Sequence, residues 1–562
     1  MEALDWIVIG VFALALIGII VWVVKQKQND SADYFLGGRD ATWLAIGASI
    51  FASNIGSEHL IGLAGAGASS GMAMAHWEIQ GWMILILGWV FVPFYSRSMV
   101  YTMPEFLERR YNSQSRTILS VISLISYVLT KVAVTVYAGG LVFQQVFGIK
   151  ELWGIDFFWI AAIGLVVLTA LYTIFGGMKS VLYTSVLQTP ILLLGSLIIL
   201  VLGFKELGGW DEMMRICGAV TVNDQGNTMT ELIRSNDDPN FPWLGALIGS
   251  AIIGFWYWCT DQFIVQRVLS GKNQKEARRG TIFGAYLKLL PVFLFLIPGM
   301  IAFALHQKYI GDGGFLPLLA NGTPNADAAF PTLVAKILPA GVKGLVVCGI
   351  LAALMSSLAS LFNSSAMLFT IDFYKRFKPQ TSEKKLVVIG QIATVVIVIL
   401  GILWIPIMRS VGDVLYTYLQ DVQSVLAPGI AAAFLLGITW KKTSAQGGMW
   451  GLIAGMVIGL TRLGAKVYYS NATVTDSSLF KYLFYDLNWL FFCGWMFLFC
   501  IVVVIAVSMF TAAPSAEKIQ GLVFGISTPE QKAATRASWN KWDIIHTLII
   551  LGITAAFYWY FW

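Results

Sequence analysis

Long runs of apolar residues recur along nearly the whole chain and are separated by short polar segments. The runs extend from Trp6 to Trp562, and most are close to the ~20 residues that a helix needs to cross a hydrocarbon core of ~30 Å. About fourteen such runs can be counted by this criterion. Because backbone polar groups must be satisfied internally in lipid, the pattern predicts an all-α membrane protein.

The polar segments predict one membrane domain and its orientation. Only 12% of the 562 residues are charged, about half the share in a soluble domain (~25%), and no polar segment is long enough for a separate soluble domain. The run at 6–26 has neither a preceding basic residue nor a following cleavage site, so we expect it to remain as an extra helix. Lys and Arg gather in alternate loops, which predicts an N-terminus outside the cell. The net charge of +6 therefore reflects topology and gives no argument for nucleic-acid binding.

Two of the runs are interrupted. The second, at 44–71, is rich in glycine and carries Asn54, Glu58 and His59 at mid-membrane depth, and the seventh continues from Gly254 into a polar stretch at 260–262. A charged group at that depth costs at least ~2.5 kcal/mol, so it should face protein or a watery cavity. Matching interrupted segments in two halves indicate an inverted repeat around a transporter's midplane site. We therefore expect a transport core of five plus five helices at 41–440 and three additional helices at 441–562.

Several polar and aromatic residues within the apolar runs could bind a sugar. The hydroxyls of a sugar need hydrogen-bond donors and acceptors, and its C–H faces pack on aromatic rings. These candidates are Asn54, His59, Glu78, Tyr257, Trp258, Lys288, Tyr416 and Gln420. Each polar residue alone is equally compatible with a structural role, such as an ion pair of Lys288 with Glu78 or Asp261. Taken together, the set favours a site. Lys131, also in an apolar run, is expected to form a structural ion pair.

The ninth run carries serines at four-residue spacing, Ser356, Ser360 and Ser364, with Ser357 adjacent. Small residues at this spacing are typical of helix packing, with each hydroxyl bonded to the preceding turn. The alternative is a sodium site, in which hydroxyls of this helix combine with carbonyls freed where the second run unwinds. The four histidines show no metal-ligand spacing, so metal catalysis is not expected.

Five segments resemble the sodium/glucose cotransporter branch of the sodium:solute symporter family. They read ASNIGSEHLIGLAGAG, FWYWCTDQFIVQRVLSGKN, GAYLKLLPVF, ALMSSLASLFNSS and YTYLQDVQSVLAPGIAAAFLLGITWKKT. The resemblance implies a LeuT-type inverted-repeat core within about fourteen transmembrane helices. It implies sodium ligands at the carbonyls of Ala52, Ile55 and Ala353 and the hydroxyls of Ser356 and Ser357. It implies sugar contacts at Asn54, His59, Glu78, Lys288 and Gln420 beside Trp258, an inner gate at Tyr257, and an outer gate of Leu63, Trp77 and Tyr416.

The sequence departs from the family pattern in ways that bear on stoichiometry and substrate. Ser185 stands where a carboxylate is usual and Ala359 where two-sodium members have threonine, so one sodium per sugar is expected. Gly254 replaces a polar residue three positions before the gating Tyr257, which removes one hydroxyl contact and leaves the preferred hexose open.

The resulting expectation is a sodium-coupled symporter of a neutral, glucose- or galactose-like hexose. It would act in the plasma membrane, or in the cell inner membrane of a bacterium, with sodium as its only co-ligand. The alternatives are symport of inositol, sialic acid or an amino acid, a sensor of the same fold, and an intramembrane glycan-processing enzyme using Glu78 or Asp261 as acid or base. A carboxylate substrate would need a partner of opposite charge, whereas the site holds Glu78, so a neutral polyol is favoured.

Overall fold

The computed structural model describes residues 1–26, 30–56, 58–319, 321–411, 415–470 and 477–562. At 129–130, 407–411, 415–421 and 470 it describes the backbone alone.

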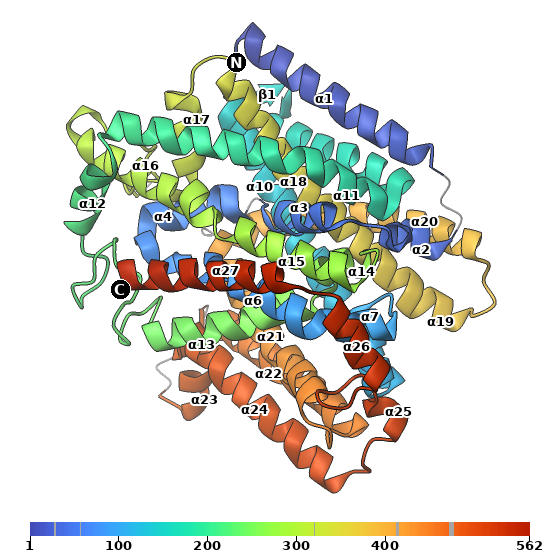
Figure 1. The fold of residues 1–562 in the computed structure, drawn as a ribbon. Helices are drawn as coiled ribbons and strands as arrows, with labels where there is room; N and C mark the ends of the chain where they lie inside the picture. The colour runs from blue at the N-terminus through green and yellow to red at the C-terminus, as the bar shows by residue number, and fades with distance from the viewer. Residues whose placement is uncertain (27–29, 57, 320, 412–414, 471–476) are drawn as a thin grey trace.

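Helices make up nearly all of the described chain (Figure 1). The first half contains α1 (Ala3–Val24), α2 (Ser31–Leu36), α3 (Trp43–Asn54), α4 (Ala64–Ser70), α5 (Ala75–Glu78), α6 (Gly81–Ile86), α7 (Val92–Ser98), α8 (Met103–Arg110), α9 (Ser113–Ser126), α10 (Ala133–Phe147), α11 (Phe157–Leu207), α12 (Trp210–Gly218) and α13 (Trp243–Gly254). The second half contains α14 (Gln262–Leu269), α15 (Gln274–Lys288), α16 (Ile297–Lys308), α17 (Ala329–Ile337), α18 (Val342–Met367), α19 (Lys375–Phe377), α20 (Glu383–Val411), α21 (Leu415–Thr439), α22 (Ala445–Ser470), α23 (Leu479–Lys481), α24 (Trp489–Phe510), α25 (Ala516–Ile519), α26 (Pro529–Ala537) and α27 (Lys541–Tyr560).

Short segments of other geometry join these helices. The π-helical segments are η2 (Glu58–Leu63), η4 (Leu87–Phe91), η5 (Tyr127–Val132), η6 (Phe255–Thr260), η7 (Val292–Leu296), η10 (Leu368–Tyr374) and η11 (Tyr482–Asp486). The 3₁₀ turns are η1 (Gly37–Arg39), η3 (Gly71–Met74), η8 (Ile310–Asp312) and η9 (Ala326–Ala328). Two short strands, β1 (Glu151–Leu152) and β2 (Ile155–Asp156), form an antiparallel hairpin.

Eleven helical segments among the described residues are long and apolar enough to cross a membrane. Their burial separates the centre of the protein from its periphery. In the most apolar window of the segment Val342–Phe377, 89% of residues are buried, against 17% for Ala3–Val24 and 22% for Lys541–Tyr560. The peripheral helices therefore present apolar faces outward, as lipid contact requires, and the all-α membrane protein predicted from the hydrophobic pattern is confirmed.

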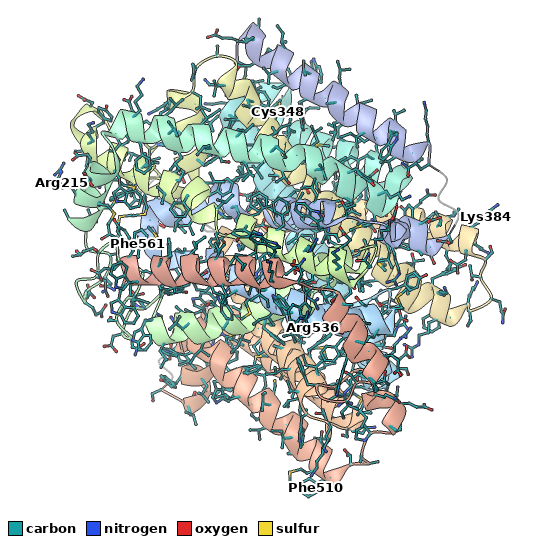
Figure 2. The ribbon with its side chains drawn as sticks, viewed as in Figure 1. Arg215, Cys348, Lys384, Phe510, Arg536 and Phe561 are labelled. Atoms are coloured by element: carbon teal, nitrogen blue, oxygen red, sulfur yellow. The ribbon has the colours of Figure 1, made fainter. Side chains whose placement is uncertain are left out.

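The central helix α18 packs against α11, α1, α20 and α3, and α15 runs along α3. A second group, α21, α22 and α24, packs together in the lower part of Figure 1. Side chains fill the space between the ribbons, and the charged Arg215 and Lys384 lie at opposite edges of the protein in this view (Figure 2). The longest helix, α11, has 51 residues, or about 76 Å at 1.5 Å per residue, and is kinked at Gly177 (φ 53°, ψ −147°).

Both interruptions expected in the apolar runs are present. Helix α3 ends at Asn54, Ile55 is extended (φ −80°, ψ 104°), and helical structure resumes at Glu58 in η2. The segment α13–η6 ends at Thr260, Asp261 is extended (φ −77°, ψ 127°), and α14 begins at Gln262. We call these the first and the second break. Helices α3 and α14 contact each other, so the fold brings the two breaks into one region of the protein interior.

Candidate functional site

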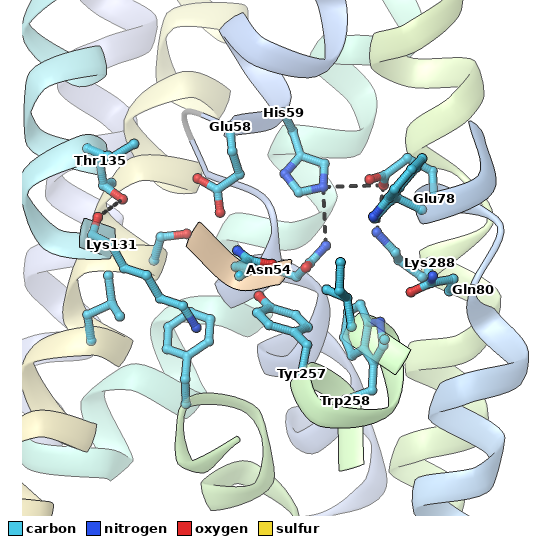
Figure 3. Close-up of a pocket in the computed structure, with 18 residues that line it drawn as sticks. Asn54, Glu58, His59, Glu78, Gln80, Lys131, Thr135, Tyr257, Trp258 and Lys288 are labelled. Atoms are coloured by element: carbon cyan, nitrogen blue, oxygen red, sulfur yellow. Dashed lines mark hydrogen bonds and ion pairs between the residues drawn. The ribbon is translucent and has the colours of Figure 1, made fainter. Parts of the chain in front are cut away.

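A cavity lies between the two breaks and is lined from both of them (Figure 3). Asn54, Glu58 and His59 reach it from the first break, and Tyr257 and Trp258 reach it from η6, just before the second. Of the residues predicted from the sequence, those that line this cavity are Asn54, His59, Trp77, Glu78, Tyr257, Trp258, Lys288 and Ser357. The fold therefore gathers side chains that are as far apart in the sequence as Asn54 and Ser357.

Glu78 is the centre of a charged network at the cavity wall. Its Oε2 accepts a hydrogen bond from Lys288 Nζ at 2.6 Å and lies 3.3 Å from His59 Nε2. The same His59 nitrogen is 3.3 Å from Asn54 Nδ2. Glu78 is only 2% exposed, and Lys288 and His59 are each 4% exposed. Burying the Glu78 and Lys288 charges is tolerable because they are paired, and the network offers a substrate both donors and acceptors from α3, η2, α5 and α15.

Aromatic rings form the apolar part of the same wall. Lys288 Nζ lies 5.4 Å from the centroid of the Trp258 ring, and the Tyr257 and Trp258 rings meet edge to face at 4.9 Å. Trp77 is stacked on Trp489 with ring centroids 5.5 Å apart. The predicted gate residue Leu63 is completely buried at the end of η2. Rings beside a polar network suit a ligand with apolar C–H faces and polar edges.

Lys131 forms a second buried network around Asp261 at the second break. Its Nζ donates to Asp261 Oδ2 at 2.7 Å, and the Tyr127 hydroxyl donates to Asp261 Oδ1. The ammonium group also lies 4.8 Å from the ring centroids of both Tyr257 and Phe263, within cation–π range. The structural ion pair predicted for Lys131 is thus confirmed. Asp261 is its partner, so Lys288 pairs with Glu78 and not with Asp261.

Two of the predicted sodium ligands, Ile55 and Ser357, are in contact at the first break. Ser357 Oγ of α18 donates to the carbonyls of Ser53 at 2.8 Å and Ile55 at 3.3 Å, and Ser356 Oγ lies 3.3 Å from Ser185 Oγ of α11. Ala52 lies in the last turn of α3, and Ala353 lies one turn before Ser357 in α18; both are buried. The serine stripe also makes packing contacts, as the alternative interpretation expected. Ser360 Oγ is 2.7 Å from Ser53 Oγ, and Ser364 Oγ donates to Gln266 at 2.7 Å.

The cavity also contains polar residues that the sequence interpretation did not place in the site. Glu58, Gln80, Gln423 and Lys131 line it. Glu58 was visible as part of the polar cluster of the second run, but Gln80 and Gln423 carried no distinguishing signal. The side chains of the predicted Tyr416 and Gln420 lie outside the described residues. Gln423 is three positions beyond Gln420 on α21, close to the same helical face.

The broken helices, the central cavity and the apolar periphery are features of a multi-pass membrane transporter. The profile of the sodium:solute symporter family matches residues 34–455. The chain is 36% identical over 540 residues to human sodium/myo-inositol cotransporter 2, covering 93% of this chain and 79% of the relative. It is 37% identical over 540 residues to sodium/glucose cotransporter 1 of Ovis aries, covering 91% of this chain and 79% of the relative.

The chain belongs to the sodium:solute symporter family. Its fold also matches the solved substrate-bound, outward-open structure of a Na+-coupled sialic acid symporter, with a TM-score of 0.74, 22% identity and coverage of 92% of this chain and 99% of the other. The protein is therefore a sodium-coupled solute symporter and not an enzyme. Sodium accompanies the solute as a transported ion.

Proposed function

We propose that this protein carries a neutral hexose, or a ring polyol of the same chemistry, together with one sodium ion. The observation that carries the proposal is the Glu78–Lys288–His59–Asn54 network beside Trp258 at the wall of the cavity. Related chains that bear the names sodium/glucose cotransporter and sodium/myo-inositol cotransporter support it. Myo-inositol is the second candidate, because the same donors and acceptors would serve its hydroxyls.

The charge balance of the cavity favours a neutral solute. Lys288 is paired with Glu78 and Lys131 with Asp261, while Glu58 lines the cavity as a further acidic group. A carboxylate substrate would approach Glu58 and Glu78 without a cation of its own, and like-charge contacts in a desolvated site are costly. A hydroxyl, in contrast, can donate to Glu78 and accept from Lys288.

We place the sodium ion at the first break, between the carbonyls of Ala52, Ile55 and Ala353 and the hydroxyls of Ser356 and Ser357. The hydrogen bonds of Ser357 to the Ser53 and Ile55 carbonyls indicate how close these oxygens lie. An uncharged set of oxygens from an unwound helix and its neighbour suits a hard monovalent cation. Bound there, the ion would hold α3 against α18 beside the sugar site.

Transport follows by alternating access. Sodium bound at the first break favours the state in which Asn54 and His59 face the substrate, and a ligand shifts a conformational equilibrium only by such a difference in affinity. The outer gate then closes at Leu63, Trp77 and Tyr416. Movement of Tyr257 opens the path from the site to the inside of the cell. One charge across ~100 mV supplies about 2.3 kcal/mol, and a tenfold sodium gradient supplies about 1.4 kcal/mol more. Together these are enough for accumulation of several hundred-fold.

The same proposal assigns the helices to about fourteen crossings, with a five-plus-five inverted-repeat core at 41–440 and an N-terminus outside the cell. It divides α11 at the Gly177 kink and the segment Glu58–Ser98 before α5, and it counts α9 with α10 as one crossing. The plasma membrane, or the inner membrane of a bacterial cell, is the proposed location.

Uptake into proteoliposomes tests the proposal. Labelled glucose, galactose and myo-inositol are presented under an inward sodium gradient, and parallel vesicles receive an equal potassium gradient. We expect sodium-dependent accumulation of at least one of the three, and little uptake of sialic acid or proline. Glu78→Gln should abolish this uptake, whereas Glu212→Gln, at the exposed pair with Arg215, should leave it unchanged. Sodium-independent uptake, or none for any polyol, would contradict the proposal.

The coupling ratio is measured separately, from the reversal potential of sugar-dependent current. Ser185 lies between Ser49 and Ser356 and brings no carboxylate to this part of the interior. We therefore expect a reversal potential that corresponds to one sodium per sugar. A value that requires two sodium ions would contradict the stoichiometry without affecting the substrate assignment.

A further inference from the structure

Gln80 enters the cavity at a short interruption between two helices. Helix α5 ends at Glu78 and α6 begins at Gly81, so Ile79 and Gln80 form a turn immediately after the central carboxylate of the site. The side chain of Gln80 is 3% exposed and lines the cavity, where it is drawn with Glu78 and Lys288 in Figure 3. An uncharged amide at this position is a hydrogen-bonding group beside the proposed sugar contacts.

One end of this amide is anchored. Gln80 Nε2 donates to the Ser250 carbonyl of α13 at 2.8 Å. Because only the NH₂ group can donate to a carbonyl, this bond fixes which end of the amide is the oxygen. Within the described chain, Oε1 accepts no hydrogen bond, so an oriented acceptor remains at the cavity wall.

Gly254 provides the space that the amide occupies. A Cβ atom built at Gly254 would lie 2.5 Å from Gln80 Oε1, which is closer than Cβ atoms come in real structures, and 3.1 Å from Nε2, which is a tight contact. The backbone of Gly254 is helical (φ −63°, ψ −40°), so alanine is compatible with the local conformation. A methyl group at position 254 would therefore displace the end of the Gln80 side chain, so the two positions are coupled by volume.

We propose that Gln80 is a specificity-determining residue, whose Oε1 accepts a hydrogen bond from one hydroxyl of the substrate while Gly254 keeps the amide in place. This inference rests on the proposed function and adds the position of a further substrate contact. A substrate that lacks this hydroxyl leaves Oε1 unpaired when the cavity closes. Buried polar groups without partners reject a ligand far more strongly than a mismatch in size does.

The test is how strongly a series of deoxy sugars inhibits uptake of the parent sugar. Competition by the 2-, 3-, 4- and 6-deoxy forms of the transported sugar is measured in proteoliposomes for the full-length wild type and for Gln80→Ala. For one hydroxyl position, we expect the wild type to bind the deoxy form about tenfold more weakly than the parent sugar. In Gln80→Ala this penalty should fall to less than about twofold, while the penalties at the other positions and the sodium dependence remain.

Two further variants separate recognition from folding. Gly254→Ala should reproduce the deoxy penalties of Gln80→Ala, because the added methyl group displaces the amide. The double variant should show the same penalties as either single variant. Gln80→Met keeps the side-chain volume and replaces Gln80→Ala in the test if that variant folds poorly. It should lose the same deoxy penalty. Gln144→Ala, which removes a partly buried amide that donates to Asp156 and does not line the cavity, is the matched control and should change none of the penalties.

The outcomes distinguish this inference from the function on which it rests. If the wild type takes up no polyol with sodium, the proposed function itself fails. If the wild type transports a sugar and all deoxy penalties survive in both Gln80→Ala and Gln80→Met, only the role of Gln80 is overturned. Additive effects of Gln80→Ala and Gly254→Ala would likewise overturn the coupling between the two positions.

Discussion

The two helix breaks satisfy their backbone groups in different ways. At the first break, the carbonyls of Ser53 and Ile55 receive hydrogen bonds from a single neutral hydroxyl, Ser357 of α18. At the second break, the Asp261 carboxylate caps α14 by accepting from the Phe263 N–H at 3.2 Å. That carboxylate is in turn held by Lys131 and Tyr127. The first break is thus closed by uncharged oxygens and hydroxyls, and the second by a buried ion pair.

This difference indicates that the breaks have different tasks. A buried helix end needs partners for its backbone groups, and at the second break the Phe263 N–H of α14 donates to both the Asp261 carboxylate and the Tyr127 hydroxyl. At the first break several carbonyl oxygens lie close to hydroxyls that could turn toward a cation. We infer that the first break changes conformation when the ion binds, whereas the second break, next to Tyr257, keeps its conformation. The following predictions test this contrast, in order of decreasing effect.

The largest effect is expected from Asp261→Asn. Asparagine can still cap α14, but the Lys131 ammonium loses its counter-ion in a buried site, and removing one partner of a buried pair costs about 3 to 5 kcal/mol. The neighbouring Arg267 increases the penalty: it is completely buried, and within the described chain its guanidinium donates no hydrogen bond. We expect a clearly lower melting temperature in detergent and loss of uptake.

The double variant Lys131→Met/Asp261→Asn is the control for this prediction. It removes both charges of the pair at similar volume, so it should recover much of the melting temperature that the single variant loses. An unchanged melting temperature in Asp261→Asn would contradict the view of the second break as a fixed, charge-held joint.

A smaller but specific effect is expected from Ser357→Ala at the first break. The substitution removes one proposed sodium ligand and leaves the overall fold intact. Interactions with a charged group contribute about 1.5 to 3 kcal/mol, so the sodium concentration for half-maximal uptake should rise about 10- to 150-fold. A lower melting temperature with unchanged sodium dependence would instead assign Ser357 to helix packing.

The smallest effect is expected from Ser364→Ala on the same helix. Ser364 Oγ donates to Gln266 Oε1 at 2.7 Å, two turns beyond Ser357, and touches neither break. The sodium dependence of uptake should therefore stay at the wild-type value, with a modest loss of thermal stability as the only change. A sodium affinity reduced as much as in Ser357→Ala would contradict a sodium site localised at the first break.

Much of the fold could be predicted from the sequence because a membrane-spanning helix is indicated by the residues of its own segment. Runs of about 20 apolar residues predict spanning helices one by one. Glycine and charge within such a run predict an interruption, which is why the breaks near Ile55 and Asp261 could be expected. Lys131 and Lys288 could be expected to have partners, since an unpaired ammonium group in an apolar helix is too costly.

Which groups become partners could not be predicted in this way. Lys288 had two candidate partners, Glu78 and Asp261, and the choice depends on how α15 lies against α5 and how η5 lies against the second break. Gln80 gave no signal in an apolar run, because its direction depends on the turn between α5 and α6 and on the space above Gly254. Gln423 was not expected because helical spacing alone does not fix which residues of α21 face the cavity.

The sequence by itself determined that the protein is a helical membrane transporter with two interrupted helices and with charges that must be paired inside it. These properties follow from the cost of transferring each residue into a low-dielectric interior, and that cost is a property of the residue and its near neighbours. Only the tertiary structure decided which charges meet, which hydroxyls face the freed carbonyls and which amide lines the cavity. Such contacts join residues far apart in the chain, and their geometry is set by the packing of whole helices.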